Sequence, residues 1–313
     1  MKVIGIESTA HTFGIGVVDE KFNVLADERV HYSPKEGIIP IEAAQFHEKN
    51  AAGLLKKIED KIDLKEIDLI GLSFGPGLPP CLYYGLKFAK DLSKKLGKPL
   101  ISVNHCQAHI EIGKIMTMLK SPVTLYVSGG NTQIIYENEG YKILGETQDI
   151  GIGNAIDKLG RAAGLSFPAG PKIEKIARKG KFVMLPYSVK GMDLNFSGIL
   201  SESIRRFEKG DNKENIFYSF QEVCFAMLTE ITERAIAATE KKELLLVGGV
   251  AQNNRLQEML EIMCKDRKAK FEVVPKEFAG DNGTMIAMTA LVNYRAKKLG
   301  EVEIKPNWRV DNI

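Results

Sequence analysis

The sequence is poor in the features that mark secreted, membrane and cysteine-based metal proteins. Its 313 residues contain four cysteines, no CxxC spacing and a single tryptophan, so we expect neither a disulfide framework nor a cysteine zinc site. No apolar run approaches the roughly 18 residues that a membrane-spanning helix needs. The opening MKVIGIESTA has the pattern of a strand entering a turn, not of a secretory signal. We therefore expect a cytoplasmic protein with no membrane contact.

An excess of one charge is also lacking. The net charge is +3 and 27% of the residues are charged, which by itself does not indicate nucleic-acid binding. The 44% hydrophobic content is ordinary for a globular chain. A length of 313 residues exceeds one comfortable core, so we expect two domains or one duplicated domain.

An internal echo favours duplication. Residues 2–20 form an apolar run, a small polar turn and a second apolar run, and 123–140 repeat this design. A strand, a glycine turn and a helix start follow at 68–80 and again at 243–260. The alternative interpretation is that the repeated pattern is only the order of strands, turns and helices that α/β proteins commonly share. The sharper prediction is a duplicated actin-like, sugar-kinase-like α/β fold, with a cleft between two similar subdomains and glycine turns suited to phosphate.

The predicted boundaries follow from this echo. Subdomain I covers 1–118 and subdomain II covers 119–290, while 291–313 could pack back on the first. Helical periodicity predicts helices near 105–119, 153–163, 170–179, 198–208, 214–239 and 281–298.

Two of the five histidines, His105 and His109, lie four residues apart in NHCQAH. On a helix they share one face and can reach a single ion, whereas Cys106 points about 100° away. Such a pair alone is weak evidence, and capping or partner-binding histidines are the alternative. Zinc peptidases of the HExxH type need a glutamate where Cys106 stands, so a peptidase is disfavoured.

A third ligand should be an acid at a helix start. Asp281 in FAGDNGTMIA has that position, with a helix N-cap as its alternative role. Tyr126 could add a phenolate, although a core aromatic is the simpler interpretation. Two imidazoles, a carboxylate and a phenolate would suit iron or zinc better than magnesium.

Phosphoryl transfer is poorly supported. Kinases and ATPases of this architecture use a carboxylate in each hairpin, but this chain has Glu7 and Ser8 in the first and 128–131, SGGN, in the second. We keep two alternative functions beside a metal-assisted reaction: an ATPase or phosphotransferase of this fold, and a non-catalytic nucleotide-binding scaffold.

A set of ordered motifs, from residue 5 to about 290, resembles one family. They are GIESTAHTFGIGVV, SFGPGLPPCL, NHCQAH, YVSGGNTQ, IGNAIDKLGRAAGL, FPAGPKIEKIAR, SVKGMDLNFSG, GGVAQN and AGDNGTMIA. Together they are similar to the tRNA threonylcarbamoyladenosine transferases, in the archaeal and eukaryotic branch that forms the catalytic subunit of the KEOPS complex.

The resemblance implies transfer of a threonylcarbamoyl group from threonylcarbamoyl-AMP to the exocyclic amine of the adenosine next to the anticodon of ANN-decoding tRNAs. It implies one metal ion, iron favoured over zinc, held by His105, His109, Asp281 and Tyr126. It also implies threonylcarbamoyl-AMP or ATP/AMP in the cleft. The residues matched to substrate or nucleotide binding are Tyr126, Val127, Ser128, Gly129, Gly130, Asp157, Gly170, Glu174 and Asn253.

Other roles are less defined. The catalytic base is unknown, with Glu7 as a candidate, and His47 is left out because PIEAAQFHEK departs from the family pattern. Partners implied by the resemblance are tRNA, a small kinase-like protein and a dimerising subunit. Basic clusters at 87–98 and 172–181 could contact tRNA, although a solvated helix face is the default interpretation.

Overall fold

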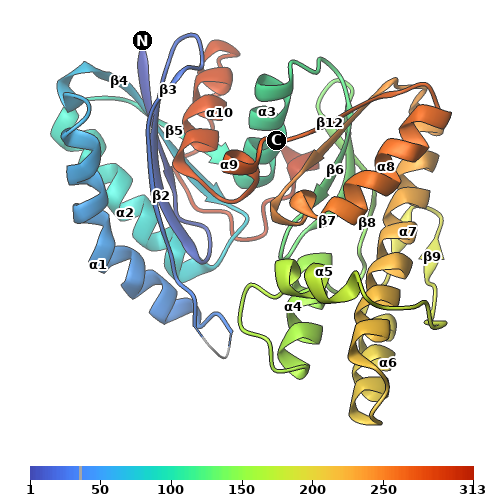
Figure 1. The fold of residues 1–313 in the computed structure, drawn as a ribbon. Coiled ribbons are helices and arrows are strands. Elements are labelled where there is room, and N and C mark those ends of the chain that lie inside the picture. The colour runs from blue at the N-terminus through green and yellow to red at the C-terminus, as the bar shows by residue number, and fades with distance from the viewer. Residues whose placement is uncertain (35–36) are drawn as a thin grey trace. The chain divides into compact units, whose positions relative to one another are not determined.

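Each half of the chain folds around a five-stranded sheet (Figure 1). The computed structural model describes residues 1–34 and 37–313. They form two units: unit 1 contains 1–115 and 280–313, and unit 2 contains 116–279. The sequence predicts a division at 118/119 and a return after 290. In the structure the return begins at residue 280, because the helix that follows packs on the first sheet from its first turn.

The sheet of unit 1 has the order β3-β2-β1-β4-β5. The first three strands are antiparallel neighbours, and β4 and β5 then continue parallel to β1. Their bounds are β1 Lys2–Glu7, β2 Thr12–Asp19, β3 Val24–His31, β4 Ile67–Gly75 and β5 Leu100–Asn104.

Helices cover both faces of this sheet. Ile4 and Ile6 point into a core shared with α1 and α2, whereas Gly5, between them, faces α10. A side chain at Gly5 would meet the backbone of Ala287 at 2.2 Å, so α10 lies directly on the strands. The helices of unit 1 are α1 Pro40–Glu59, η1 Leu64–Glu66, α2 Pro79–Leu96, α3 His105–Thr117, α10 Gly283–Arg295 and η3 Val310–Asn312.

The sheet of unit 2 repeats the same plan. Its order is β12-β11-β6-β7-β8, with β6, β7 and β8 antiparallel and with β11 and β12 parallel to β6. The bounds are β6 Val123–Val127, β7 Thr132–Glu137, β8 Tyr141–Glu146, β11 Glu243–Val247 and β12 Lys270–Val273, with a small hairpin of β9 Val189–Lys190 and β10 Asp193–Leu194. Because both sheets add strands in one order and direction, the predicted duplication is confirmed.

The core of unit 2 surrounds the long helix α7, whose buried face carries Phe217, Phe220 and Phe225. Its helices are α4 Ile152–Ala162, α5 Gly170–Ala177, α6 Ser197–Glu208, α7 Lys213–Thr239, η2 Gly249–Gln252, α8 Asn254–Asp266 and α9 Lys276–Ala279. The helices predicted from periodicity are confirmed to within a few residues. Among the described residues, no helix combines the length and the apolarity that crossing a bilayer requires.

Candidate functional site

The candidate site of unit 1 lies where parallel strands end. The carboxyl ends of β1 and β5 carry Glu7 and Asn104, and α3 begins directly after β5 with His105. Asn104 accepts a hydrogen bond from the Gln107 N–H at 3.1 Å, which fixes the first turn of α3. In folds of this class, ligands bind at the carboxyl ends of the strands.

Three predicted ligands come together there. His109 Nε2 lies 3.2 Å from Asp281 Oδ1, and His105 Nε2 lies 3.6 Å from the same oxygen. Metal–ligand bonds of about 2.0–2.2 Å separate neighbouring ligands by roughly 3–3.5 Å, so these spacings fit one ion. Asp281 does not cap the helix: Asn282 accepts from the Met285 N–H and takes that role. The Asp281 carboxylate is therefore left for the histidines.

An outer layer of contacts orients His105. Its Nδ1 lies 3.0 Å from Glu7 Oε2, and since a carboxylate only accepts, Nδ1 is the donor. The other oxygen, Glu7 Oε1, accepts from the Thr9 N–H at 2.7 Å. This contact turns His105 Nε2 toward Asp281, the arrangement seen when a carboxylate supports a metal-ligating histidine.

The charges of this cluster call for a cation. Burial is the largest influence on His105 and lowers its pKa, but the carboxylates of Glu7 and Asp281 together raise that pKa to about 9. Burial lowers the pKa of His109. Burial raises the pKa of Asp281, but the histidines together outweigh burial and hold that pKa well below its usual range. Two buried imidazoles and one partly buried carboxylate, with ligand atoms all within 4.8 Å of one another, are a donor set that fits a divalent metal ion.

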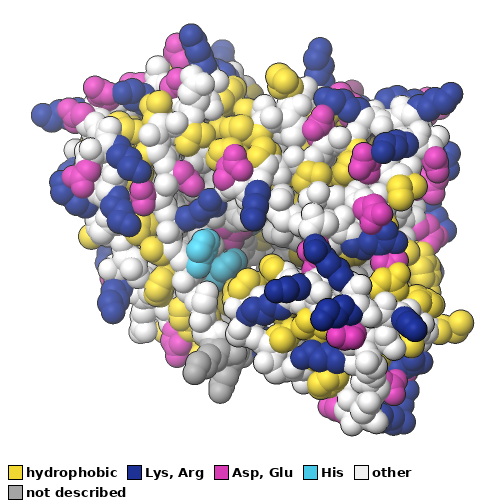
Figure 2. Space-filling view, viewed as in Figure 1, with side chains coloured by type: hydrophobic (Ala, Val, Ile, Leu, Met, Phe, Trp, Pro, Cys, Tyr) yellow, Lys and Arg dark blue, Asp and Glu magenta, His cyan; other side chains and the backbone are white. Residues whose placement is uncertain are grey.

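Two further histidines, missed in the sequence, border the cluster. His11 follows β1, and its Nδ1 lies 3.9 Å from Asp281 Oδ2, while its ring stacks on His31 with 6.0 Å between centroids. Arg29 donates to the Asp281 carbonyl at 3.4 Å. Figure 2 shows histidine side chains (cyan) gathered in one place on the displayed face. All five histidines of the chain belong to unit 1. That small number, confined to one unit, is the only signal in the sequence that could have pointed to His11 and His31.

His47 supports the loop that carries Glu7. The Ser8 hydroxyl donates to the Cys81 carbonyl at 2.9 Å, so His47 Nδ1 donates to Ser8 Oγ, also at 2.9 Å. Burial lowers the pKa of His47 to about 4, which keeps the ring neutral. The sequence analysis leaves His47 out of the site, whereas the structure joins it by this hydrogen bond to the residue that follows Glu7.

The predicted glycine loop belongs to unit 2. Tyr126 and Val127 end β6 and are buried, and the turn at 128–131 lies against the start of α4. The carbonyls of Ser128 and Gly129 accept from the N–H groups of Gly153 and Asn154 at 3.1 and 3.0 Å. Gly153 is required there, because an added Cβ would meet the Ser128 carbonyl oxygen at 2.6 Å. The assignment of Tyr126 as a fourth ligand remains a prediction.

The other predicted nucleotide contacts follow a line from α4 through α5 to α8. Asp157 accepts from the Ala169 N–H at 2.8 Å, directly before Gly170, and Glu174 accepts from Asn254 Nδ2 at 2.6 Å. Asn253 caps α8 and donates to Gln221 at 2.9 Å.

Gly170 stands apart within that line. An added Cβ would come no nearer than 3.8 Å to any atom, so the fold itself does not require glycine there. A ligand that approaches the backbone would require it.

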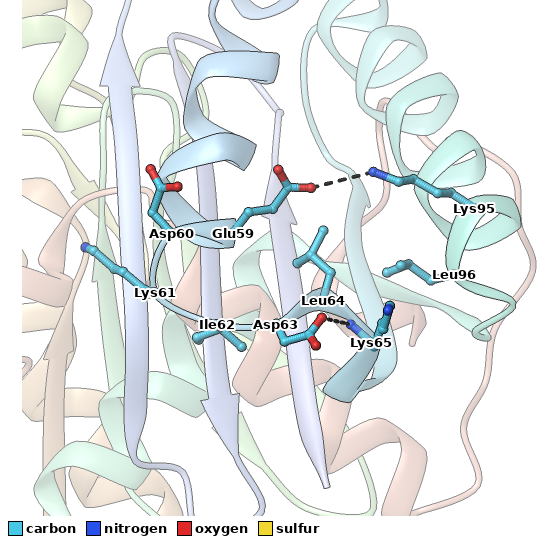
Figure 3. Close-up of a pocket in the computed structure, with 9 residues that line it drawn as sticks. All are labelled: Glu59, Asp60, Lys61, Ile62, Asp63, Leu64, Lys65, Lys95 and Leu96. Atoms are coloured by element: carbon cyan, nitrogen blue, oxygen red, sulfur yellow. Dashed lines mark hydrogen bonds and ion pairs between the residues drawn. The ribbon is translucent and has the colours of Figure 1, made fainter.

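A depression of about 630 Å³ is a separate feature of unit 1 (Figure 3). It is lined by the end of α1, the segment before β4 and the end of α2, so it adjoins the amino end of β4, opposite to the histidines. Several of its charged side chains already have partners inside unit 1: Glu59 pairs with Lys95 at 3.6 Å, and Asp63 accepts from the Lys65 backbone N–H at 2.9 Å. We assign it no part in the chemistry.

Solved structures show the same fold at low identity. The chain aligns with T. kodakarensis HypF with a TM-score of 0.64 and 17% identity, over 97% of this chain and 49% of that one. It aligns with Acidaminococcus fermentans (R)-2-hydroxyglutaryl-CoA dehydratase component A with a TM-score of 0.58 and 10% identity, over 94% of this chain and 99% of that one. These likenesses confirm the predicted duplicated, actin-like fold.

Sequence relatives are much nearer. The family model described as tRNA N6-adenosine threonylcarbamoyltransferase matches residues 22–288. An enzyme of that name from Archaeoglobus fulgidus is 52% identical, over all of this chain and 98% of the relative. A Methanocaldococcus jannaschii protein named probable bifunctional tRNA threonylcarbamoyladenosine biosynthesis protein is 50% identical, and this chain spans 60% of its length. The chain therefore belongs to the tRNA N6-adenosine threonylcarbamoyltransferase family, as its motifs predict, and is an acyltransferase that acts on tRNA.

Proposed function

We propose that this chain transfers the threonylcarbamoyl group from threonylcarbamoyl-AMP to the exocyclic amine of the adenosine next to the anticodon of ANN-decoding tRNAs, with metal assistance. The observation that carries the metal is the cluster of His105, His109 and Asp281, whose ligand atoms all lie within 4.8 Å of one another. Iron is favoured over zinc, with Tyr126 as a fourth ligand.

The reaction balances as an acyl transfer. The amine nitrogen forms a bond to the carbamoyl carbon, the bond from that carbon to the phosphate oxygen breaks, and AMP leaves with the electron pair. One amine proton is released. A bound metal ion would polarise the acyl carbonyl or hold the threonyl part.

The residues of the chain bind and orient. We propose that the N–H groups of the glycine loop, 128–130, hold the phosphate of the adenylate, and that Asp157 and Glu174 accept from its ribose hydroxyls. Gly170 leaves room for the nucleotide, and Asn253 holds its base. Glu7 is better suited to positioning than to proton removal, because both of its oxygens already accept hydrogen bonds inside unit 1.

We further propose that the enzyme acts with partners of the KEOPS type. The bifunctional relatives support this, since about two fifths of such a protein lies beyond the part that this chain matches. A separate small kinase-like protein would correspond to that part, and a dimerising subunit would complete the assembly.

The test compares wild type with His105→Ala/His109→Ala for bound metal and for tRNA modification in the presence of partners. We expect the variant to lose the ion and at least a hundredfold in modification rate. Glu261→Ala/Lys265→Ala removes an exposed ion pair of α8 and should change neither readout. Full metal content in the histidine variant would refute the site, and unimpaired modification would refute its catalytic role.

A further inference from the structure

An extended segment of unit 2 presents large apolar side chains to solvent. Phe182 is 57% exposed, Met184 is 77% exposed and Tyr187 is 52% exposed. Between them, Val183 packs against the core and Leu185 is buried within it. From Phe182 to Leu185 the alternation is that of an extended chain with one face inward, yet its outward face is apolar as well, and Tyr187 adds a second exposed aromatic ring. Exposed apolar groups of this size, gathered in the six residues 182–187, indicate a contact surface.

The backbone of this segment is held firmly. The Lys181 N–H donates to Asn215 Oδ1, and the Val183 N–H donates to Ser219 Oγ, each at 2.7 Å. Both acceptors lie on α7, and Ser219 is fully buried. The outward side chains are thus presented from an extended segment tied to α7, which lowers the entropy cost of binding.

A basic surface adjoins the start of this segment along the chain. Figure 2 shows Lys and Arg side chains (dark blue) gathered over α4 and α5, with hydrophobic side chains among them. Between 158 and 181 the sequence has seven basic residues and one acid, Glu174, which pairs with Arg178 at 3.7 Å. The basic surface consists of Lys158, Arg161, Lys172, Lys175, Arg178, Lys179 and Lys181.

We infer that the basic surface and the outward side chains of 182–187 bind the single-stranded loop of the tRNA substrate. The inference rests on the proposed function for the identity of the RNA. Lysine and arginine contact phosphates, while splayed bases of RNA loops stack on aromatic rings. A protein partner fits less well, because lysine is depleted at protein interfaces and dominates here.

The aromatic part is tested by substitution at Phe182, with tRNA affinity measured by fluorescence anisotropy on the full chain. Phe182→Trp keeps a stacking face, and its affinity should stay within about twofold of wild type. Phe182→Leu keeps the apolar bulk without the ring, and its affinity should fall about five- to a hundredfold. Equal affinities for the Leu and Trp variants would overturn stacking at this position.

The basic part is tested through salt dependence. Lys175→Ala/Lys179→Ala/Lys181→Ala should weaken binding about tenfold and reduce the slope of log affinity against log salt by about 2 to 3. Lys56→Ala/Lys57→Ala/Lys61→Ala removes the same charge from exposed positions at and just beyond the end of α1 and should change affinity less than twofold. An equal loss in both triple variants, or no loss in the first, would overturn the surface.

The RNA surface and the proposed reaction fail separately. An anticodon stem-loop should compete for the surface, and a blunt duplex of equal length should compete at least tenfold less well. Wild type that modifies no tRNA, yet binds the stem-loop through Phe182, would refute the reaction and support the surface. Full modification with unchanged loop affinity in the Phe182→Leu variant would refute the surface and support the reaction.

Discussion

At the residue scale, Glu7 shows how one buried carboxylate can serve the site without touching a substrate. Its side chain is fully buried, and its two oxygens accept from Thr9 and from His105 Nδ1. A carboxylate in this position fixes which imidazole nitrogen faces the ion and makes that nitrogen a stronger ligand.

The first prediction follows from this contact. Glu7→Gln keeps the shape of the side chain but removes the charge, so metal affinity should fall about 10- to 100-fold. Competition with a chelator measures that affinity directly, without an activity assay. Glu20→Gln, at an exposed glutamate of the same unit, should leave it unchanged. If Glu7→Gln binds metal as tightly as wild type, the positioning role is wrong.

Asp149 provides the second residue-scale prediction. Burial raises its pKa, but hydrogen bonds from Ser197 and from the Phe196 and Ile150 N–H groups prevail and lower that pKa to about 2. Because the folded-state pKa is depressed, its stabilisation is complete above the ordinary value of 3.8 and is lost as the pH falls through about 2.

Asp149→Asn should therefore unfold about 1 kcal/mol more easily at pH 7, since the charged cap on the start of α6 is lost. The difference from wild type should shrink between about pH 4 and pH 2. Urea unfolding at several pH values measures it. A difference that grows toward acid would contradict the assignment.

At the element scale, the placement of Asp281 depends on how closely α10 approaches the sheet. A Cβ at Gly16 would lie 2.2 Å from the Thr284 nitrogen, and a Cβ at Gly283 would lie 2.1 Å from the Gly16 nitrogen. Backbone therefore meets backbone at the start of α10, one residue beyond the Asn282 cap. This contact sets the position of Asp281 opposite the histidines of α3.

Gly16→Ala should consequently destabilise the protein by at least about 3 kcal/mol, because neither backbone can yield as a side chain can. It should also weaken metal binding, since α10 must shift. Gly53→Ala is the matched control: it lies inside α1 with nothing within 4 Å, and should stabilise the protein by about 0.5–1 kcal/mol. Chemical denaturation of both variants, followed by far-UV circular dichroism, gives the comparison.

Features within a single element could be predicted from the sequence, whereas contacts between distant elements could not. Helical periodicity and glycine turns are local signals, so the helices and the duplicated strand order were predictable. His105 and His109 share one helix, so their pairing was local too. The approach of His11 and Arg29 to Asp281 was not, because it depends on where the turn after β1 and the strand β3 meet the start of α10. Sequence periodicity does not predict contacts between residues so far apart in the chain.

At the scale of the whole molecule, the two units differ in how the chain builds them. Unit 2 is one continuous segment, 116–279, with its own sheet and core. Unit 1 needs both ends of the chain, because α10 is buried on nearly every side against β1, β2 and β4. Three of the four predicted metal ligands, His105, His109 and Asp281, belong to unit 1, whereas Tyr126 belongs to unit 2.

A segment of 116–279 should therefore unfold cooperatively when expressed alone, whereas 1–115 alone should not fold. Near-UV circular dichroism and amide NMR dispersion distinguish the two outcomes. A cooperative fold in 1–115 alone would contradict the essential role of α10.

Joining 1–115 to 280–313 should restore unit 1. His109 lies 3.2 Å from Asp281, and Ile115 is only about 9 Å further along α3, so a flexible linker of about ten residues spans the gap. This fusion contains three ligands and lacks Tyr126. It should bind one metal ion. If the Tyr126 phenolate is a ligand, the fusion should bind the metal more weakly than the full chain, and this loss of metal affinity should equal the loss caused by Tyr126→Phe in the full chain. Equal affinity of fusion, full chain and Tyr126→Phe would instead show that the two imidazoles and one carboxylate hold the ion without it.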